Sequence, residues 1–177
     1  MTPQTDWVRD VDAVRKELDG ASDRAAITIG GGLVELALEQ ALLSVLRAPK
    51  NKDEASRLFN GGGIIETFSQ KIWACYFLKV ISPTARKDLD TIRKIRNIAA
   101  HHVNPISFDD QQITDLCANL PRAAKPAKAT NRKQFVTTVL IYTGLLIAYS
   151  VLPEKAEIGG DETVNGVGLG TDADAVP

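Results

Sequence analysis

The sequence has few of the residues and patterns that would indicate a metal site, a disulfide or a β-sheet. Its 177 residues include two cysteines, Cys75 and Cys117, and two histidines. Both cysteines lie inside apolar helical patterns, and no Cys/His cluster has metal-ligand spacing, so we expect buried thiols and no metal site. No segment alternates apolar and polar residues between turn signals, and we therefore expect no β-strand.

The net charge is also small, and the charged residues are unevenly distributed along the chain. The formal net charge is −1, while residues 153–177 carry −5 and the rest of the chain +4. This surplus is far below that of proteins that wrap nucleic acid without sequence preference. Part of it lies in a basic linker expected at residues 121–133, which could contact RNA or an acidic partner.

Signals for export and for nucleotide cofactors are missing as well. The N-terminus lacks the basic-then-apolar pattern of a signal peptide, so we expect a cytoplasmic chain. The loop Gly61-Gly62-Gly63 lacks the lysine and the serine or threonine of a phosphate-binding loop. We therefore expect no cofactor.

What the chain does contain is apolar residues at helical spacing, which make up much of the 44% apolar fraction. This pattern predicts an all-α fold, a single-domain helical bundle of about six to seven helices over residues 1–152. The Gly- and acid-rich stretch 153–177 is expected to be a disordered tail. The predicted helices cover residues 7–18, 22–47, 53–59, 65–80, 83–102, 108–120 and 132–152.

Two of these helices need a further explanation. Gly30, Gly31 and Gly32 lie inside the second helix, where each costs roughly 1 kcal/mol relative to alanine. Close approach of another helix or a helix break would account for them. The last helix contains an uncharged run at 135–152, which reaches the lower length limit for spanning a bilayer. We favour a central helix buried in the bundle, with no membrane span.

The main functional signal is the run from Arg93 to His102 at the end of the fifth predicted helix. At 100° per residue, Arg93, Asn97 and His101 form one polar stripe, and Arg96 lies at the border of the core face. His102 points away from the stripe. The same projection assigns a core face to Ala85, Ile92, Ile95 and Ala99.

Two interpretations of the stripe remain open. The stripe holds a histidine that could exchange protons, an arginine that could bind phosphate and an asparagine that could orient either side chain. These three residues would suffice for metal-free RNA cleavage. The same residues would also suffice for a network that stabilises a helix end. Glu35 and Glu39, an i, i+4 acidic pair, could then pair with Arg93 or Arg96.

A longer pattern of short segments runs through the chain. These segments are Ser22-Asp23-Arg24, Leu33-Val34-Glu35, Leu58-Phe59, Phe68-Ser69-Gln70-Lys71-Ile72, Ile81-Ser82, Asp88 to Asn97, Ala100-His101-His102, Ser107 to Asp110, and Asp115 to Leu120. The pattern resembles the mannitol operon repressor (MtlR-type) family. The resemblance implies an all-helical fold without a recognisable DNA-binding motif, acting through a regulatory protein partner, and we expect a homodimer.

The end of the motif is also similar to the Arg-x4-His motif of the HEPN superfamily, many of whose members are RNases with two motifs meeting across a dimer interface. The similarity implies that Arg96 binds phosphate, Asn97 assists and His101 transfers protons, with His102 as a second candidate. We favour a transcriptional regulator that acts through protein–protein interaction and binds no DNA directly. The alternative is a metal-independent RNase or an RNA-binding module.

Overall fold

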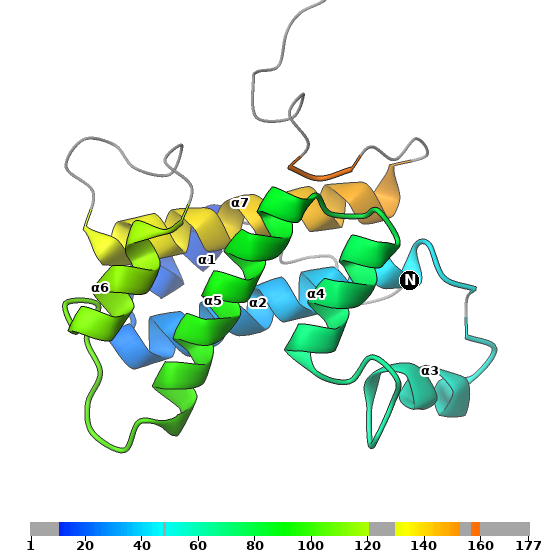
Figure 1. Ribbon diagram of the computed structural model, residues 1–177, viewed down its shortest axis with the longest axis horizontal. Helices are drawn as coiled ribbons and strands as arrows, with labels where there is room; N and C mark the ends of the chain where they lie inside the picture. Colours follow the sequence, from blue (N-terminus) through cyan, green and yellow to red (C-terminus); the bar gives the residue numbers. More distant parts are fainter. Residues whose placement is uncertain (1–10, 48, 121–129, 153–156, 160–177) are drawn as a thin grey trace, which may run out of the picture.

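The computed structural model describes residues 11–47, 49–120, 130–152 and 157–159 and shows an all-α fold (Figure 1). These residues contain seven helices and no β-strand, which confirms the predicted fold class. The helices are α1 (Val11–Gly20), α2 (Asp23–Leu43), α3 (Lys52–Phe59), α4 (Phe68–Phe77), α5 (Pro83–His101), α6 (Gln111–Ala118) and α7 (Asn131–Val151).

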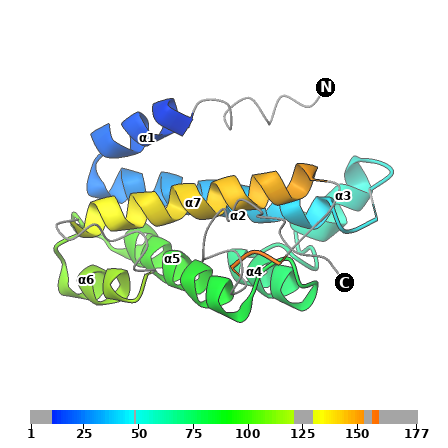
Figure 2. The same ribbon diagram turned by 90° about the horizontal axis from the view of Figure 1, so that it is seen from above.

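The helices form three layers around a pair of long central helices. Figure 2 shows α2 and α7 side by side in the middle layer, with α1 on one face and α4, α5 and α6 on the other. α3 lies at the far end, beyond the C-terminus of α2. Because α2 and α7 are covered from both sides, most of their large apolar side chains are buried.

Local sequence signals explain where the helices begin. Ser22 and Ser82 act as N-caps and accept hydrogen bonds from the backbone two to three residues inside α2 and α5. Pro83 occupies the first turn of α5, as predicted. The last helix is capped by Thr130 and not by Asn131, which is its first residue. The side chain of Asn131 instead donates hydrogen bonds to the loop before α6 and to α6 itself.

Several predicted helices are longer than the observed ones. The helix expected at 65–80 is α4, which begins at Phe68 because Thr67 and Gln70 form a capping box before it. It ends at Phe77, and Lys79 takes a positive φ of 57° just beyond. The helix expected to reach residue 47 ends at Leu43. At both C-terminal ends, backbone hydrogen bonds continue for a few residues as turns, with Leu46 donating to Leu42 and Val80 donating to Cys75.

Two of the three consecutive glycines of α2 lie where another helix comes close. A β-carbon on Gly30 would lie 3.1 Å from the ring of Phe135 on α7, and one on Gly31 would lie 2.7 Å from Cγ of Arg96 on α5. A β-carbon on Gly32 would meet open space. Because α2 is continuous through all three, close helix approach is confirmed and a helix break is excluded.

Both central helices, α2 and α7, are long and apolar enough to cross a membrane by length and composition alone. In the structure they pack against each other, and 50% and 56% of their most apolar windows are buried inside the bundle. The last helix is therefore a central bundle helix, as the sequence predicted.

Arg132, at the start of α7, attaches α1 to the rest of the bundle. Its Nη2 donates hydrogen bonds to the carbonyl oxygens of Leu18 and Asp19, at 2.6 and 3.1 Å. Its Nη1 lies 2.7 Å from a carboxylate oxygen of Asp23, the first residue of α2. The sequence placed Arg132 in the basic linker open to RNA or an acidic partner, but the guanidinium is engaged within the fold. Residues 121–129 of that linker lie outside the described residues.

A short stretch from the expected C-terminal tail lies against the start of α5. Ile158 forms an isolated parallel β-bridge with Ile81. Its amide donates to the carbonyl of Val80, and its carbonyl accepts from the amide of Ser82. The side chain of Ile158 is buried in the core. The sequence assigned this residue to the disordered tail, and the structure instead orders it; residues 153–156 and 160–177 lie outside the described residues.

Candidate functional site

α5 has one buried face and one polar face, as the helical projection predicted. Its buried residues include all four that were assigned to the core, together with Leu89 and an acid, Asp88. Asp88 follows the same 100° spacing, so its burial could have been anticipated from the sequence. Arg93, Arg96 and Asn97 are partly exposed, and His101 is exposed at the end of the helix.

Asp88 is held in the core by Tyr142 of α7, whose hydroxyl donates a hydrogen bond of 2.5 Å to the carboxylate. Burial raises the pKa of Asp88, and the hydrogen bond from Tyr142 only partly opposes this shift. Burial and the neighbouring Asp88 also raise the pKa of Tyr142. This pair joins α5 to α7 beneath the functional face and is not open to a ligand.

Within the polar stripe, Arg93 is paired along its own helix. The Arg93 guanidinium pairs with Asp90, one turn earlier, with Nη2 2.8 Å from a carboxylate oxygen. Lys94 pairs with the second oxygen of the same carboxylate at 3.0 Å. Partial burial pushes the pKa of Asp90 upward, but hydrogen bonds and charges from Lys94 and Arg93 outweigh it and lower that pKa. Arg93 is thus paired along its own helix, and of the two arginines considered as partners for Glu35 and Glu39 it is Arg96 that contacts Glu35.

Arg96 reaches the surface across Gly31. Its aliphatic stem packs on the bare backbone of α2, and its guanidinium emerges beyond the glycine. There Nη1 donates to Oδ1 of Asn97 at 3.3 Å, and Nη2 lies 4.0 Å from a carboxylate oxygen of Glu35. The predicted contact between Arg96 and Glu35 therefore exists, but it is long and partly exposed to solvent.

Both glutamates of α2 pair with a lysine that the sequence analysis did not single out. Nζ of Lys71, on α4, lies 3.2 Å from Glu35 and 3.2 Å from Glu39. Lys71 is buried, and its ammonium also lies 6.0 Å from the centre of the Phe59 ring. A single lysine inside the apolar pattern of the fourth helix was the signal that could have revealed it.

A polar cavity of about 380 Å³ opens beside Arg96, between α2, the N-terminus of α4 and α5. It brings two arginines and the first backbone amides of a helix to one place, which suits an anion, but two glutamates also line it. Its lining residues are Glu35, Glu66, Thr67, Phe68, Ser69, Arg93, Arg96 and Asn97.

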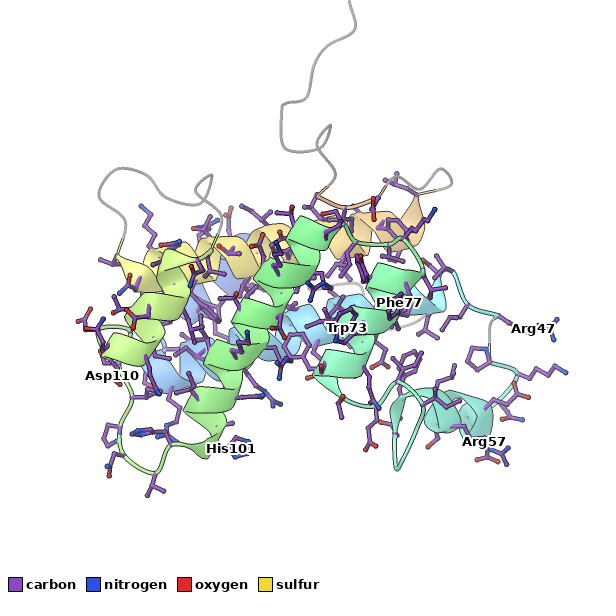
Figure 3. The ribbon with its side chains drawn as sticks, viewed as in Figure 1. Arg47, Arg57, Trp73, Phe77, His101 and Asp110 are labelled. Carbon is purple, nitrogen blue, oxygen red and sulfur yellow. The ribbon has the colours of Figure 1, made fainter. Side chains whose placement is uncertain are left out.

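His101 does not line this cavity. Figure 3 shows it at the free end of α5, and among the described residues its ring has no hydrogen-bond partner. His102 caps the helix, and its Nδ1 lies 3.2 Å from the carbonyl oxygen of Asn104. Arg24, from the first turn of α2, donates to the carbonyls of both His102 and Asn104 and so anchors this turn. The structure brings Arg93, Arg96 and Asn97 together and leaves both histidines outside.

A second surface, on α4, was not predicted as a site. Trp73 and Phe77 stack with ring centres 5.6 Å apart, and 44% and 73% of their surfaces are exposed. The guanidinium carbon of Arg86, from α5, lies 4.6 Å from the Trp73 ring centre and 5.6 Å from that of Tyr76. Trp73 and Phe77 are labelled on α4 in Figure 3.

Other candidate chemistry is absent from the described parts of the chain or is unreactive there. Within the described residues, no group of three or more His, Cys, Asp or Glu side chains could hold a metal ion. Cys75 and Cys117 are buried and form no disulfide, which confirms the predicted buried thiols. Burial raises the pKa of Cys75 to about 12, so its thiol stays protonated at neutral pH.

The described residues define a small all-α bundle that has a polar cavity beside Arg96 and an exposed aromatic and cationic cluster on α4 and α5. No family model matches the chain, and no curated protein matches its sequence. Among solved structures, the fold is similar to a chain in the X-ray structure of the MtlR–HPr complex from Escherichia coli, with a TM-score of 0.64. The match has 19% identity and covers 78% of this chain and 99% of the other. The resemblance noted from the sequence is therefore supported at the level of the fold.

Proposed function

We propose that this chain is a regulator of the mannitol-repressor type that acts by binding another protein, without direct contact to DNA. The observation that carries the proposal is the exposed cluster of Trp73, Phe77 and Arg86. Stacked aromatics and arginine on a rigid helix are the residues that most often supply binding energy at protein interfaces. Similarity in fold to a structure solved as a protein–protein complex supports the same function.

The chemistry around this cluster indicates what kind of protein would bind. We call it the α4–α5 surface and define it by Trp73, Phe77, Leu78, Lys79, Arg86 and Lys87. All six are exposed or partly exposed, and three of them are cations. α4 carries no acidic residue. A partner that places an apolar side chain on the rings and acidic residues beside the cations would match this surface.

The test compares binding by variants of this surface. We would titrate HPr from the same cell with the wild type, Trp73→Ala and Phe77→Ala, and would compare proteins retained from the lysate by each immobilised form. Val103→Ala is the matched control, because Val103 is 96% exposed on another loop. We expect about tenfold or greater loss of affinity in the two aromatic variants, as for interface hot spots.

Two outcomes would count against the proposal. In the first, every protein that the wild type retains from the lysate is also retained by Trp73→Ala and Phe77→Ala. The other is that Trp73→Ala and Val103→Ala bind every retained protein equally. We extend the proposal to a cytoplasmic location and a homodimer, and light scattering of the purified chain tests the dimer.

A second candidate function is RNA cleavage or RNA binding, favoured by the convergence of Arg93, Arg96 and Asn97 on the polar cavity. Such a group could hold a phosphate. His101 lies outside the cavity, so a catalytic site would require a histidine from a second copy. The assay is RNA cleavage in EDTA with the wild type, Arg96→Ala, His101→Ala and the control Lys94→Ala. Wild-type activity that both site variants lose would support an RNase, and inactivity of the wild type excludes it.

A further inference from the structure

The described chain ends at the first turn of α5, which is followed directly by two residues of the α4–α5 surface. The hydroxyl of Ser82 donates a hydrogen bond of 2.8 Å to the carbonyl oxygen of Gly159. A β-carbon on Gly159 would lie 2.9 Å from that hydroxyl oxygen and 3.0 Å from Cβ of Ala85. Gly159 also has a φ of +77°, which a residue with a side chain rarely adopts. The chain therefore leaves the bundle in contact with the first turn of α5.

The next residues of α5 are cations. Arg86 and Lys87 directly follow Ala85, and Lys79 lies in the turn between α4 and α5. The acids of α5 do not neutralise them, because Asp88 is buried against α7 and Asp90 is paired with Arg93 and Lys94. The α4–α5 surface thus carries an excess of positive charge.

The sequence that follows Gly159 has the opposite charge. Residues 160–177 contain four acids and no lysine or arginine. The acids stand at both ends of this sequence, and the apolar residues Val164, Val167 and Leu169 stand between them. Those four acids are Asp161, Glu162, Asp172 and Asp174.

We propose that the acidic segment 160–177 binds the α4–α5 surface of its own chain and competes there with an acidic protein partner. Its acids face Lys79, Arg86 and Lys87, and its apolar residues cover the rings of Trp73 and Phe77. The inference rests on the proposed function for the competition, while binding of the segment itself is tested independently. It makes the C-terminal segment an internal ligand of the recognition surface.

The geometry allows this contact without strain. Eighteen residues can extend up to about 60 Å, whereas the whole of α5, from Pro83 to His101, rises only about 27 Å. Because the segment is joined to the surface at Gly159, binding is intramolecular, and its effective concentration is on the order of millimolar. Weak individual ion pairs therefore suffice to keep the surface occupied at low salt, and salt weakens them.

The experiment measures how accessible Trp73 is in the full-length chain. Trp7→Phe leaves Trp73 as the single tryptophan. In this background, the tail variant carries Asp161→Asn, Glu162→Gln, Asp172→Asn and Asp174→Asn. The control carries Asp12→Asn, Glu17→Gln, Asp53→Asn and Asp109→Asn, which change the net charge equally at exposed positions on other elements.

We expect acrylamide to quench Trp73 about twofold more strongly in the tail variant than in the control, because exposed ion pairs hold the segment only weakly. High salt should raise quenching of the control protein to the level of the tail variant. Equal quenching of the two variants at low salt would overturn the proposal. Protection that increases with protein concentration would assign the surface to a second copy and would also overturn binding in cis.

Failure of this inference can be told apart from failure of the proposed function. If the segment does not bind but Trp73→Ala still loses a protein partner, only the internal ligand is excluded. If the segment binds the surface and Trp73→Ala also loses a protein partner, the tail variant should bind that partner more tightly than the control does. A tail variant that binds the partner no better than the control would contradict the competition.

Discussion

The side chain of Arg96 lies directly across Gly31, where the functional helix α5 crosses the central helix α2. A β-carbon on Gly31 would lie 2.7 Å from Cγ and 2.9 Å from Cβ of Arg96. Atoms this close would overlap, so the arginine can occupy this side of α5 only because α2 has no side chain there. The glycine thereby directs the guanidinium into the polar cavity.

Replacing this glycine should therefore destabilise the bundle. Gly31→Ala improves helix propensity by about 1 kcal/mol but overpacks the crossing, at a cost of about 1–3 kcal/mol. We expect a lower free energy of unfolding in urea. Gly32→Ala is the matched control, since a β-carbon there meets open space, and it should be neutral or stabilising. Equal effects of the two substitutions would show that the crossing is looser than described.

The buried Lys71 should matter more than its exposed counterparts. Lys71→Met keeps the stem but leaves Glu39 without its cation and Glu35 with only the long contact to Arg96. Because both glutamates are partly exposed, we expect a loss of about 1–3 kcal/mol in unfolding free energy, less than for a fully buried pair. Adding Glu35→Gln and Glu39→Gln should restore part of it.

The control for this prediction is Lys94→Met, which removes the more exposed cation from Asp90. Its effect on urea denaturation should stay below about 0.5 kcal/mol, as for surface ion pairs. If Lys71→Met were as mild as Lys94→Met, the α2–α4 contact would not depend on the lysine.

Asp88 and Asp90 should respond to pH in opposite directions. Burial raises the pKa of Asp88 above 3.8, so the native state keeps this proton to higher pH than the unfolded chain. Stability is therefore lost as pH rises from about 3.8 through the raised pKa. Asp88→Asn removes this loss. Its free energy of unfolding should therefore increase relative to that of the wild type as pH rises through that range.

The pKa of Asp90 is lowered below 3.8, despite partial burial, by Lys94 and Arg93. Its contribution is present above 3.8 and is lost as pH falls through the lowered pKa. The deficit of Asp90→Asn relative to wild type should thus shrink on acidification. Urea denaturation from pH 3 to pH 7 measures both variants, and parallel curves for the two would contradict the assignment.

Arg132 should determine how firmly α1 is attached. Arg132→Lys keeps the charge but cannot reproduce the fork that reaches Leu18, Asp19 and Asp23. We expect a loss of about 1–3 kcal/mol and faster amide hydrogen exchange in α1 than in α2. Lys133→Arg is the control, because Lys133 is exposed on the same turn. Unchanged exchange in α1 after Arg132→Lys would refute this role.

The amino-acid sequence by itself determined the helical elements and their faces. Apolar spacing defines the buried sides of the helices, and Ser22, Ser82 and Pro83 mark helix starts through local capping that needs no tertiary contact. The division of α5 into a core face and a polar stripe follows from the 100° rotation per residue alone. The fold class was predictable for the same reason.

Only the tertiary structure decided which side chains meet. Helical spacing shows the face on which Arg96, Lys71 or Trp73 lies, but not which neighbouring helix faces it or where two helices cross. The crossing at Gly31 directs Arg96 to the cavity, and the packing of α4 on α2 pairs Lys71 with Glu35 and Glu39. The turn between α4 and α5 likewise places Arg86 over Trp73. These contacts join residues that are distant in sequence, so their energies depend on the packed arrangement and not on any local pattern.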